Sequence, residues 1–441
     1  MQQKEEAKMK KGIGIFVLFL SLLIIKAAMA ADKMSLSFFD GKLKVGGDFY
    51  VRFETRSDYY TQDGGRIKDY GTSSRQRLSF SLMPKEEFQF VITFLKTLDW
   101  DDPHPSLFPY AYDHGTDIQQ AYFILKPFDS IQLWAGRREI AYLNQRLIGH
   151  SYGWTNKPIN FDGAGIIFDG KRVKVDLFYL NKVLRDLDET HAFNDDWYGK
   201  PADLYGMWLT FKKVSFLGNI DTYLLFDDRD NKDNSYTPGL RVYGKKGLWD
   251  YDTNLSLQFG RKHIRGEKLE RHAWAFYVDT GYTFYNPIKA RVAFQYNYAS
   301  GDGDPNDHSY HTFDQLYACV HGKYGLMDLF SWQNMHDLYF YSTLSPIKRI
   351  KILSGIHSFW LDDAHDAWYN CYKKVQRHDP TGNADSFIGN EFDLLITYNP
   401  HYTKNVIFKA FYGHFFAASY VDDTGESDDA DYFYLQLEYR F

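Results

Sequence analysis

The feature that most constrains this chain is an alternation of apolar and polar residues with a period of two. In IKARVAFQYNY, residues 288–298, one face carries Ile288, Val292 and Phe294, and the other carries lysine, arginine, glutamine and asparagine. Residues 43–56 and 251–259 alternate in the same way. Such alternation over about ten residues is typical of β-strands with one apolar and one polar face. The chain is therefore expected to be all-β.

The connections between the predicted strands follow a second rhythm, in which short and long segments alternate. Tight turns with Pro, Gly or Lys, such as MPKE and GKKG, are followed by longer polar connections. The long connections are predicted at 57–74, 100–114, 140–161, 183–200, 228–237, 262–270, 300–323, 361–384 and 418–430. This series predicts an up-and-down meander of about 18 strands.

An open meander of this length leaves two unpaired sheet edges, so we expect it to close into a barrel. A barrel this wide suits a membrane, where the apolar face contacts lipid and the polar face lines a watery lumen. The predicted fold is a transmembrane antiparallel up-and-down β-barrel with short periplasmic turns and long extracellular loops.

The N-terminal segment predicts secretion. Four lysines precede the apolar run GIGIFVLFLSLLII, and the small residues of AMA end at Ala30. This is the pattern of a secretory signal peptide over residues 1–30. Residues 31–441 are then expected to form a single barrel domain, with 46 basic and 55 acidic side chains. That excess of acid argues against a nucleic-acid binder, which would carry a concentrated basic patch.

The C-terminal segment DYFYLQLEYRF predicts the last strand of the barrel. Its alternation places Phe433, Leu435, Leu437, Tyr439 and Phe441 toward lipid, and we expect it to pair with the first strand. A terminal Phe after alternating apolar residues resembles the signal that the outer-membrane assembly machinery reads. Phe441 therefore predicts a Gram-negative-type outer membrane, with its lipid and its assembly machinery as partners.

Four segments resemble the alginate export family of outer-membrane proteins. They are LWAGRREIAYLNQRLIGHSYGWTNKPINFDGAGI (133–166), YASGDGDPNDHSYHTFDQLY (298–317), FWLDDAHDAWYN (359–370) and GNEFDLLITYN (389–399). The first carries G-R-x-E, Q-R-L-x-G, W-x-N and F-D-G elements similar to those of the family. The resemblance implies an 18-stranded barrel, which agrees with the strand count, and a lumen that conducts an anionic polysaccharide.

Charged residues on the predicted polar faces are the candidates for pore lining and selectivity. Arginine forks recognise carboxylates and sugar hydroxyls, but the alternation also places many acids in the lumen, so neither sign dominates. A structural salt-bridge cluster is the alternative role for the charged residues at 137–146. The candidates are Arg52, Arg56, Arg77, Arg137, Arg138, Glu139, Arg146, Asp162, Arg291, Glu391 and Asp393.

Two further groups of residues have a candidate role in the loops. Asp302, Asp304 and Asp307 are oxygen ligands that suit Ca²⁺, although the spacing is not that of an EF-hand, and a solvated acidic loop is the simpler interpretation. Cys319 and Cys371 lie in two predicted outer loops, where an oxidising compartment permits a disulfide. No other cofactor is expected.

The sequence predicts a passive outer-membrane channel rather than an enzyme, since no G-x-S-x-G, H-E-x-x-H or P-loop pattern occurs. The leading hypothesis is export of an anionic or polar polysaccharide by a monomer, with periplasmic and inner-membrane polysaccharide synthesis proteins as partners. A substrate-specific uptake porin for small polar solutes is the first alternative, and a barrel enzyme at the outer leaflet is the second.

Overall fold

The computed structural model describes residues 36–441, except 61–65, 101–113, 157, 183–201, 230–232, 265, 305 and 401–404. The predicted signal peptide, residues 1–30, lies outside the described residues. The wall consists of β2 (Leu43–Tyr60), β3 (Arg66–Lys85), β4 (Phe88–Asp99), β5 (His114–Phe128), β6 (Ile131–Arg138), β7 (Phe161–Asp169), β8 (Val173–Lys182), β9 (Ala202–Phe211), β10 (Asn219–Arg229), β11 (Asp233–Lys246), β12 (Trp249–Ile264), β13 (Glu267–Thr283), β14 (Arg291–Ala299), β16 (Met335–Leu344), β17 (Ile350–Trp360), β20 (Phe387–Tyr398), β21 (Val406–Ala417) and β22 (Ala430–Arg440).

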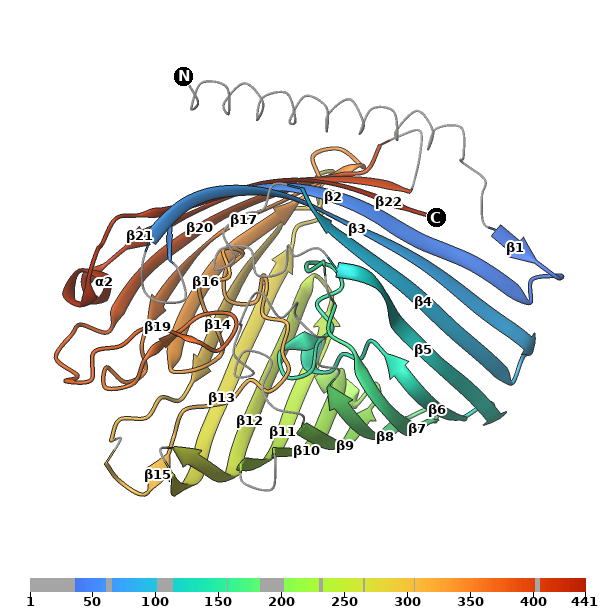
Figure 1. Ribbon diagram of the computed structural model, residues 1–441, viewed down its shortest axis with the longest axis horizontal. Coiled ribbons are helices and arrows are strands. Elements are labelled where there is room, and N and C mark those ends of the chain that lie inside the picture. Colours follow the sequence, from blue (N-terminus) through green and yellow to red (C-terminus); the bar gives the residue numbers. More distant parts are fainter. Residues whose placement is uncertain are drawn as a thin grey trace.

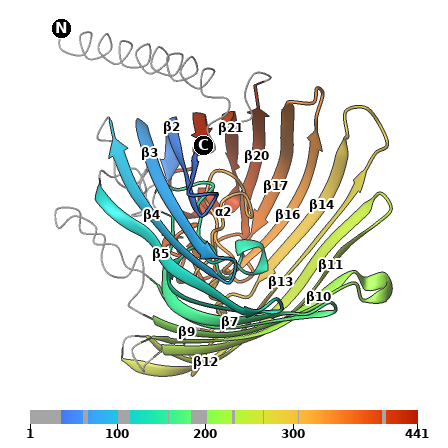
Figure 2. The same ribbon diagram turned by 90° about the vertical axis from the view of Figure 1, so that its right-hand side faces the viewer.

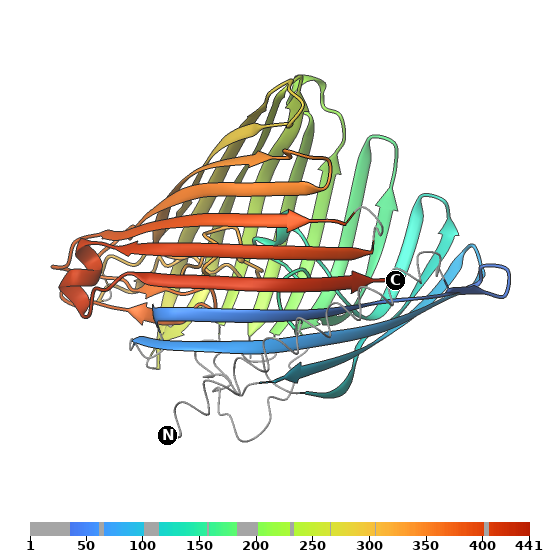
Figure 3. The ribbon, with the colours of Figure 1, turned by 90° about the horizontal axis from the view of Figure 1, so that it is seen from above.

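These 18 strands form a closed antiparallel barrel, as the alternation predicted (Figure 1). Each strand pairs with its neighbour in the chain, and β22 pairs with β2 from Asp48↔Arg440 to Ser57↔Asp431 (Figure 3). Beyond β22, the Phe441 nitrogen and oxygen both bond to Gly47, at 3.1 and 3.0 Å. The first and last strands therefore leave no open edge between them.

The two faces of the wall follow the period of the sequence. On β2, Tyr50, Arg52 and Glu54 are buried inside the barrel, whereas Phe49 and Phe53 alternate with them on the outer face. Large apolar residues are exposed around the outside, for example Ile166 at 50% and Leu435 at 47%. Among the described residues, no helix is long and apolar enough to cross a membrane. The exposed apolar residues form the lipid-facing surface of an outer-membrane barrel.

Glycines on the inner face let aromatic side chains lie flat against the wall. A Cβ added to Gly206 of β9 would lie 2.0 Å from the ring of Phe178 on β8. A Cβ added to Gly239 of β11 would lie 2.1 Å from the ring of Tyr223 on β10. Both distances are far below van der Waals contact, so a larger residue displaces the ring. Glycine at these positions is thus a packing requirement rather than a turn signal.

Three of the connections predicted to be long are shorter than expected. β2 continues to Tyr60 before β3 begins at Arg66, β10 and β11 are separated by 230–232, and β12 and β13 are separated by 265–266. The paired polar tips extend the strands beyond the apolar belt. Polarity in the sequence marks where a strand leaves the membrane, and not where its backbone pairing ends.

Two long connections fold back into the barrel. Loop 139–160 contains the 3₁₀-helix η1 (Leu143–Gln145), and loop 300–334 contains β15 (Ser309–Tyr310), which pairs with β13. Figure 2 shows both loops inside the ring of strands. Loop 361–386, with β18 (Trp368–Tyr369) and β19 (Val375–Arg377), packs against loop 300–334, since Trp368 Nε1 donates to Leu329 O at 2.9 Å. The remaining short elements are β1 (Leu36–Phe38), η2 (Ser215–Leu217) and α2 (Ser419–Thr424).

Candidate channel constriction

The two inner loops meet each other within the lumen. Ile148 and Tyr317 form a parallel bridge, in which Gly149 N donates to Tyr317 O and Tyr317 N donates to Leu147 O, both at 2.9 Å. The rings of Trp154 and His321 stack with centroids 3.5 Å apart. These contacts join loop 139–160 and loop 300–334 into one body, which we call the inner plug.

Arg52 of β2 fastens the inner plug to the wall. Its side chain is fully buried, and its guanidinium carbon lies 3.9 Å from the ring centre of Trp154. Nη1 donates to Trp154 O at 3.0 Å, while Nε lies 3.2 Å from the Glu54 carboxylate. A stacked, hydrogen-bonded guanidinium suits arginine and not lysine at this position. The predicted lumen-facing residue is therefore also a structural contact.

Asp48 is a second fastening point on the same wall. Its carboxylate accepts from Arg75 Nη2 at 2.8 Å and from the Tyr152 hydroxyl at 2.8 Å, and it lies 3.5 Å from Arg77 Nη1. Arg75 Nη1 also donates to Tyr152 O at 2.8 Å. Burial, together with the Asp48 charge, raises the pKa of Tyr152 to about 12. The hydroxyl stays protonated and remains a donor to the carboxylate at all physiological pH values.

Arg146 lies at the centre of the inner plug with part of its hydrogen-bonding capacity unused. The side chain is 2% exposed, and its guanidinium carbon lies 4.3 Å from the ring centre of Tyr277 and 5.3 Å from that of Tyr324. Its Nε and Nη1 atoms have no hydrogen-bond partner within the described part of the chain. Burial and the charge of Arg146 together lower the pKa of the neighbouring Lys323 to about 8.

No ion pair neutralises Arg146 or Lys323 among the described residues. Two cations from different loops are thus brought together beside a tyrosine pair. Unsatisfied guanidinium donors in a buried setting favour an anionic or hydroxyl-bearing ligand. Arg146 was a candidate from the sequence, whereas Lys323 was missed. The available signal was that Lys323 is the only basic residue between 301 and 334 other than histidine.

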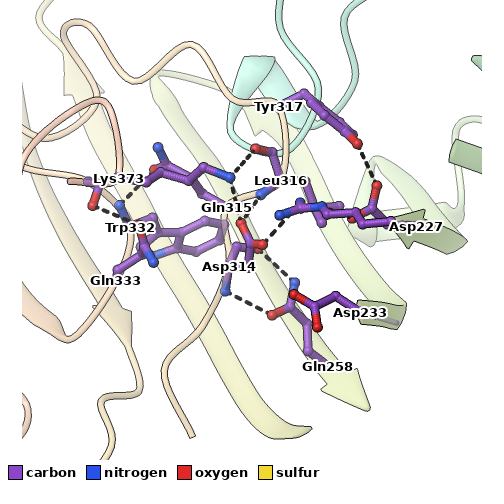
Figure 4. Close-up of polar contacts among 12 residues, drawn as sticks. Asp227, Asp233, Gln258, Asp314, Gln315, Leu316, Tyr317, Trp332, Gln333 and Lys373 are labelled. Atoms are coloured by element: carbon purple, nitrogen blue, oxygen red, sulfur yellow. Dashed lines mark hydrogen bonds and ion pairs between the residues drawn. The ribbon is translucent and has the colours of Figure 1, made fainter. Parts of the chain in front are cut away.

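Asp314 anchors loop 300–334 on the opposite wall (Figure 4). Its carboxylate lies 3.0 Å from Lys373 Nζ, 3.1 Å from Arg229 Nη2 and 3.7 Å from Arg271 Nη1. Its backbone exchanges hydrogen bonds with the Gln258 amide, at 2.9 and 2.7 Å. Burial alone raises the pKa of Asp314, but the three cations outweigh burial and hold it well below its usual range.

Glu391 and Asp393 hold the plug from a third side. Both carboxylates are completely buried on β20, where Asp393 accepts from Leu326 N at 3.1 Å and Glu391 accepts from Met327 N at 2.8 Å. Gly325 has a φ of +83°, and a Cβ there lies 2.3 Å from a Glu391 oxygen. These residues face the lumen, but they contact the plug rather than open solvent.

The remaining inward candidates are distributed around the wall. Arg56 lies over Tyr432 at 4.3 Å, Arg138 lies over Trp134 at 4.8 Å, and Glu139 pairs with Arg77 at 3.2 Å. Arg291 lies at the turn end of β14, where it pairs with Asp250 at 2.5 Å and with Asp279 at 3.2 Å. Arg291 is therefore not part of the constriction that the loops form.

Arg137 and Asp162 lie on the outer face, so the prediction that they line the pore was wrong. They pair with each other at 2.8 Å, and Asp162 is 51% exposed. On β6 the inner positions are those of Trp134 and Arg138, which places Arg137 on the opposite face. The pair lies at the loop end of the lipid-facing surface.

The loop cysteines are both free, in place of the predicted disulfide. Cys319 N donates to Gln145 O at 2.8 Å, and Cys371 N donates to Asp328 O at 3.4 Å, so each is fixed by different backbone contacts. Burial raises the pKa of both thiols.

The candidate Ca²⁺ ligands Asp302, Asp304 and Asp307 lie in loop 300–334. In the described ranges, no group of three His, Cys, Asp or Glu side chains is placed to hold a metal ion. Asp304 accepts from Asn306 N and Asp307 accepts from Ser309 N, so both serve their own loop. Burial and the adjacent Asp366 raise the pKa of Asp302 to about 6.

A closed 18-stranded barrel with a lipid-facing outside and loops folded into its lumen defines the class of outer-membrane channels. Solved structures of that class superpose on this chain. The chain belongs to the alginate export family, whose sequence profile matches residues 42–434. The fold and the family are those of a channel rather than of an enzyme.

The similar structures come from porins of Pseudomonas. OccK11 (OpdR) of Pseudomonas aeruginosa has a TM-score of 0.58 and 13% identity, covering 90% of this chain and 96% of that chain. OpdK of the same organism, determined with vanillate, has a TM-score of 0.61 and 10% identity, covering 90% and 98%. A BenF-like porin from Pseudomonas fluorescens has a TM-score of 0.58 and 11% identity, again covering 90% and 98%. No curated protein matches the chain significantly.

Proposed function

We propose that this outer-membrane channel conducts anionic or polar saccharides passively, and that the inner plug selects them. The observation that carries the proposal is the Arg146–Lys323 pair, in which a 2% exposed guanidinium keeps two nitrogens without a hydrogen-bond partner in the described part of the chain. A carboxylate that reaches this point gains charge-assisted hydrogen bonds that water supplies only weakly in a narrow lumen. Membership of the alginate export family supports a saccharide substrate.

The surrounding residues support a saccharide over a bare inorganic anion. Tyr277 and Tyr324 place aromatic faces beside Arg146. Aromatic faces offer apolar contact to the C–H face of a sugar ring, while the cations bind its carboxylate. No energy-coupling motif occurs in the sequence, so a concentration gradient supplies the driving force. Polysaccharide synthesis proteins in the periplasm and inner membrane are the proposed partners for export.

Uptake of small carboxylates is the second candidate. The two loops contact each other directly through Ile148, Tyr317, Trp154 and His321, which leaves a polymer less room than an empty barrel does. Two of the similar porins were determined with small carboxylates, OpdK with vanillate and OccK2 (OpdF) with glucuronate. Size of the solute therefore separates the two candidates.

Block of ion current in planar bilayers tests the proposal. Oligouronates added to one side are expected to interrupt the current of the wild-type channel, and neutral dextrans of the same length are expected to leave it unchanged. Arg146→Ala should weaken the block by about 10- to 100-fold, as for the loss of one charge-assisted contact. Block by monouronate alone favours small-solute uptake, and block that grows with chain length favours export. Equal block by uronate and dextran contradicts the proposal.

A further inference from the structure

Four successive short connections on one side of the barrel carry only positive charge. Segments 212–218, 245–248, 284–290 and 345–349 contain seven lysine and arginine residues and no aspartate or glutamate. They join the strands from β9 to β17, which are neighbours around the wall. The positive charges therefore form a continuous arc along the turn end, opposite the end that carries α2 (Figure 3).

Five lysines of this arc have no ionic partner in the described part of the chain. Lys212 pairs with Asp169, and Arg349 Nη1 donates to Pro400 O at 2.8 Å, so these two are engaged. The other side chains are exposed and make no ion pair among the described residues. We call these five the basic arc: Lys213, Lys245, Lys246, Lys289 and Lys348.

A large apolar residue is also exposed in each of the four connections or directly after it. Phe216 is 74% exposed, Trp249 is 55% exposed, Tyr285 is 97% exposed and Ile347 is 57% exposed. An aromatic residue at the membrane boundary sits at the level of the headgroups, and a lysine stem follows it while the ammonium reaches the phosphate layer. The repeated pairing of an apolar side chain with an unpaired cation fits a lipid surface better than it fits a soluble acidic protein.

Other connections of the rim mix both signs of charge or are acidic. Lys85 is followed by Glu86 and Glu87, and Lys126 is followed by Asp129. At the opposite end, the connection 418–429 contains five carboxylates and no lysine or arginine. Positive charge without compensation is thus concentrated on one side of the turn end, where the next connection, 399–405, also contains a lysine and no carboxylate.

We propose that the basic arc binds the headgroups of anionic phospholipids in the periplasmic leaflet, and so fixes the depth and tilt of this side of the barrel. Each lysine near an anionic surface contributes about fivefold in affinity at moderate ionic strength. The apolar partner in each connection supplies the anchor in the interface. The proposal rests on the outer-membrane location and is independent of which solute the lumen passes.

Titration of lipid onto the mature protein in neutral detergent, followed by native mass spectrometry, tests the proposal. The probes are phosphatidylglycerol and phosphatidylcholine with the same oleoyl chains. The arc variant is Lys245→Gln, Lys246→Gln and Lys289→Gln together. The matched control is Lys42→Gln, Lys85→Gln and Lys126→Gln, which removes three exposed lysines at connections that also carry carboxylates.

The wild-type protein is expected to prefer phosphatidylglycerol, and the arc variant, which lacks three lysines, is expected to lose about 100-fold of that preference while the control retains it. Equal loss in the two variants, or no preference in the wild type, overturns the proposal. Binding of soluble polyuronate by the wild type in place of phosphatidylglycerol, lost in the arc variant, reassigns the arc to the polymer and also overturns it. Bilayer conductance measured on the same variants reports the pore separately, because the arc lies outside the lumen.

Discussion

Replacing Asp314 by Asn should release loop 300–334 from the wall. The carboxylate faces three cations, Lys373, Arg229 and Arg271, at 3.0, 3.1 and 3.7 Å, and Asp314 is 8% exposed. Removing one partner of a buried charge pair typically costs about 3–5 kcal/mol, because the opposite charges stay buried without compensation. Asn keeps an acceptor for Leu316 N, so we expect a cost at the low end of this range, about 3 kcal/mol. The undocked fraction of the loop then rises about 100-fold.

Cleavage by trypsin at a single position, Lys323, measures the undocked fraction of loop 300–334. Lys323 is the only lysine or arginine between 301 and 334, and in the docked loop it lies within the lumen beside Arg146. When loop opening is fast compared with cleavage, the rate of cutting is proportional to the undocked population. The Asp314→Asn protein in detergent is expected to be cut after Lys323 about 100 times faster than the wild type, measured as a fragment by mass spectrometry.

The control for this experiment lies in the same loop. Asp304 is exposed, and its carboxylate accepts from Asn306 N within its own turn, which an asparagine side chain also does. Asp304→Asn should therefore leave the cleavage rate within about twofold of wild type. Equal rates for Asp314→Asn and wild type would refute the view that this carboxylate anchors the plug.

Three further predictions follow from particular contacts. The pKa of Lys323 is lowered to about 8, so its charge is present below that pH and is lost above it. Anion selectivity, measured from reversal potentials, should therefore fall between pH 7 and pH 9, and Lys323→Arg should abolish this fall. An unchanged pH profile in that variant would assign the effect to another group. Gly206→Ala should destabilise the barrel by about 1–3 kcal/mol, because the added Cβ would lie 2.0 Å from the Phe178 ring. The temperature at which the folded band is lost in gel electrophoresis measures this change. An unchanged temperature would contradict the packing argument. Arg137→Ala should leave the reversal potential unchanged because Arg137 lies on the outer face. A shifted reversal potential would indicate that Arg137 faces the lumen.

The wall of this barrel was predictable because its physics is local. One face of each strand contacts lipid and the other contacts water, so a residue such as Leu435 or Gln436 reveals its side by polarity alone. Closure followed from the need to pair the edge strands. The family resemblance added the strand number independently.

The sides of Arg137 and Arg138 were not predictable in the same way. The preceding residues, Leu133 to Gly136, include Trp134, which is apolar yet faces the lumen and lies over Gly165. An inward aromatic removes the contrast in polarity on which the assignment of faces depends. Two adjacent arginines then give no indication of which one points inward.

The inner plug was not predictable from the sequence, because its contacts join residues that are far apart in the chain. Arg52 stacks on Trp154, Arg146 approaches Lys323, and Asp314 reaches Arg229. No periodicity links these pairs, since they arise only when two loops turn inward rather than outward. Composition showed that the loops were polar, but buried ion pairs and solvated loops share that composition.

The most direct test of the account is the single-channel current of the mature protein in a planar bilayer. A passive channel narrowed by an inner plug is expected to give discrete, reproducible conductance steps, and Asp314→Asn is expected to add larger or fluctuating steps as loop 300–334 leaves the lumen. Protein that is folded and inserted but carries no ion current would contradict the assignment of this barrel as a channel.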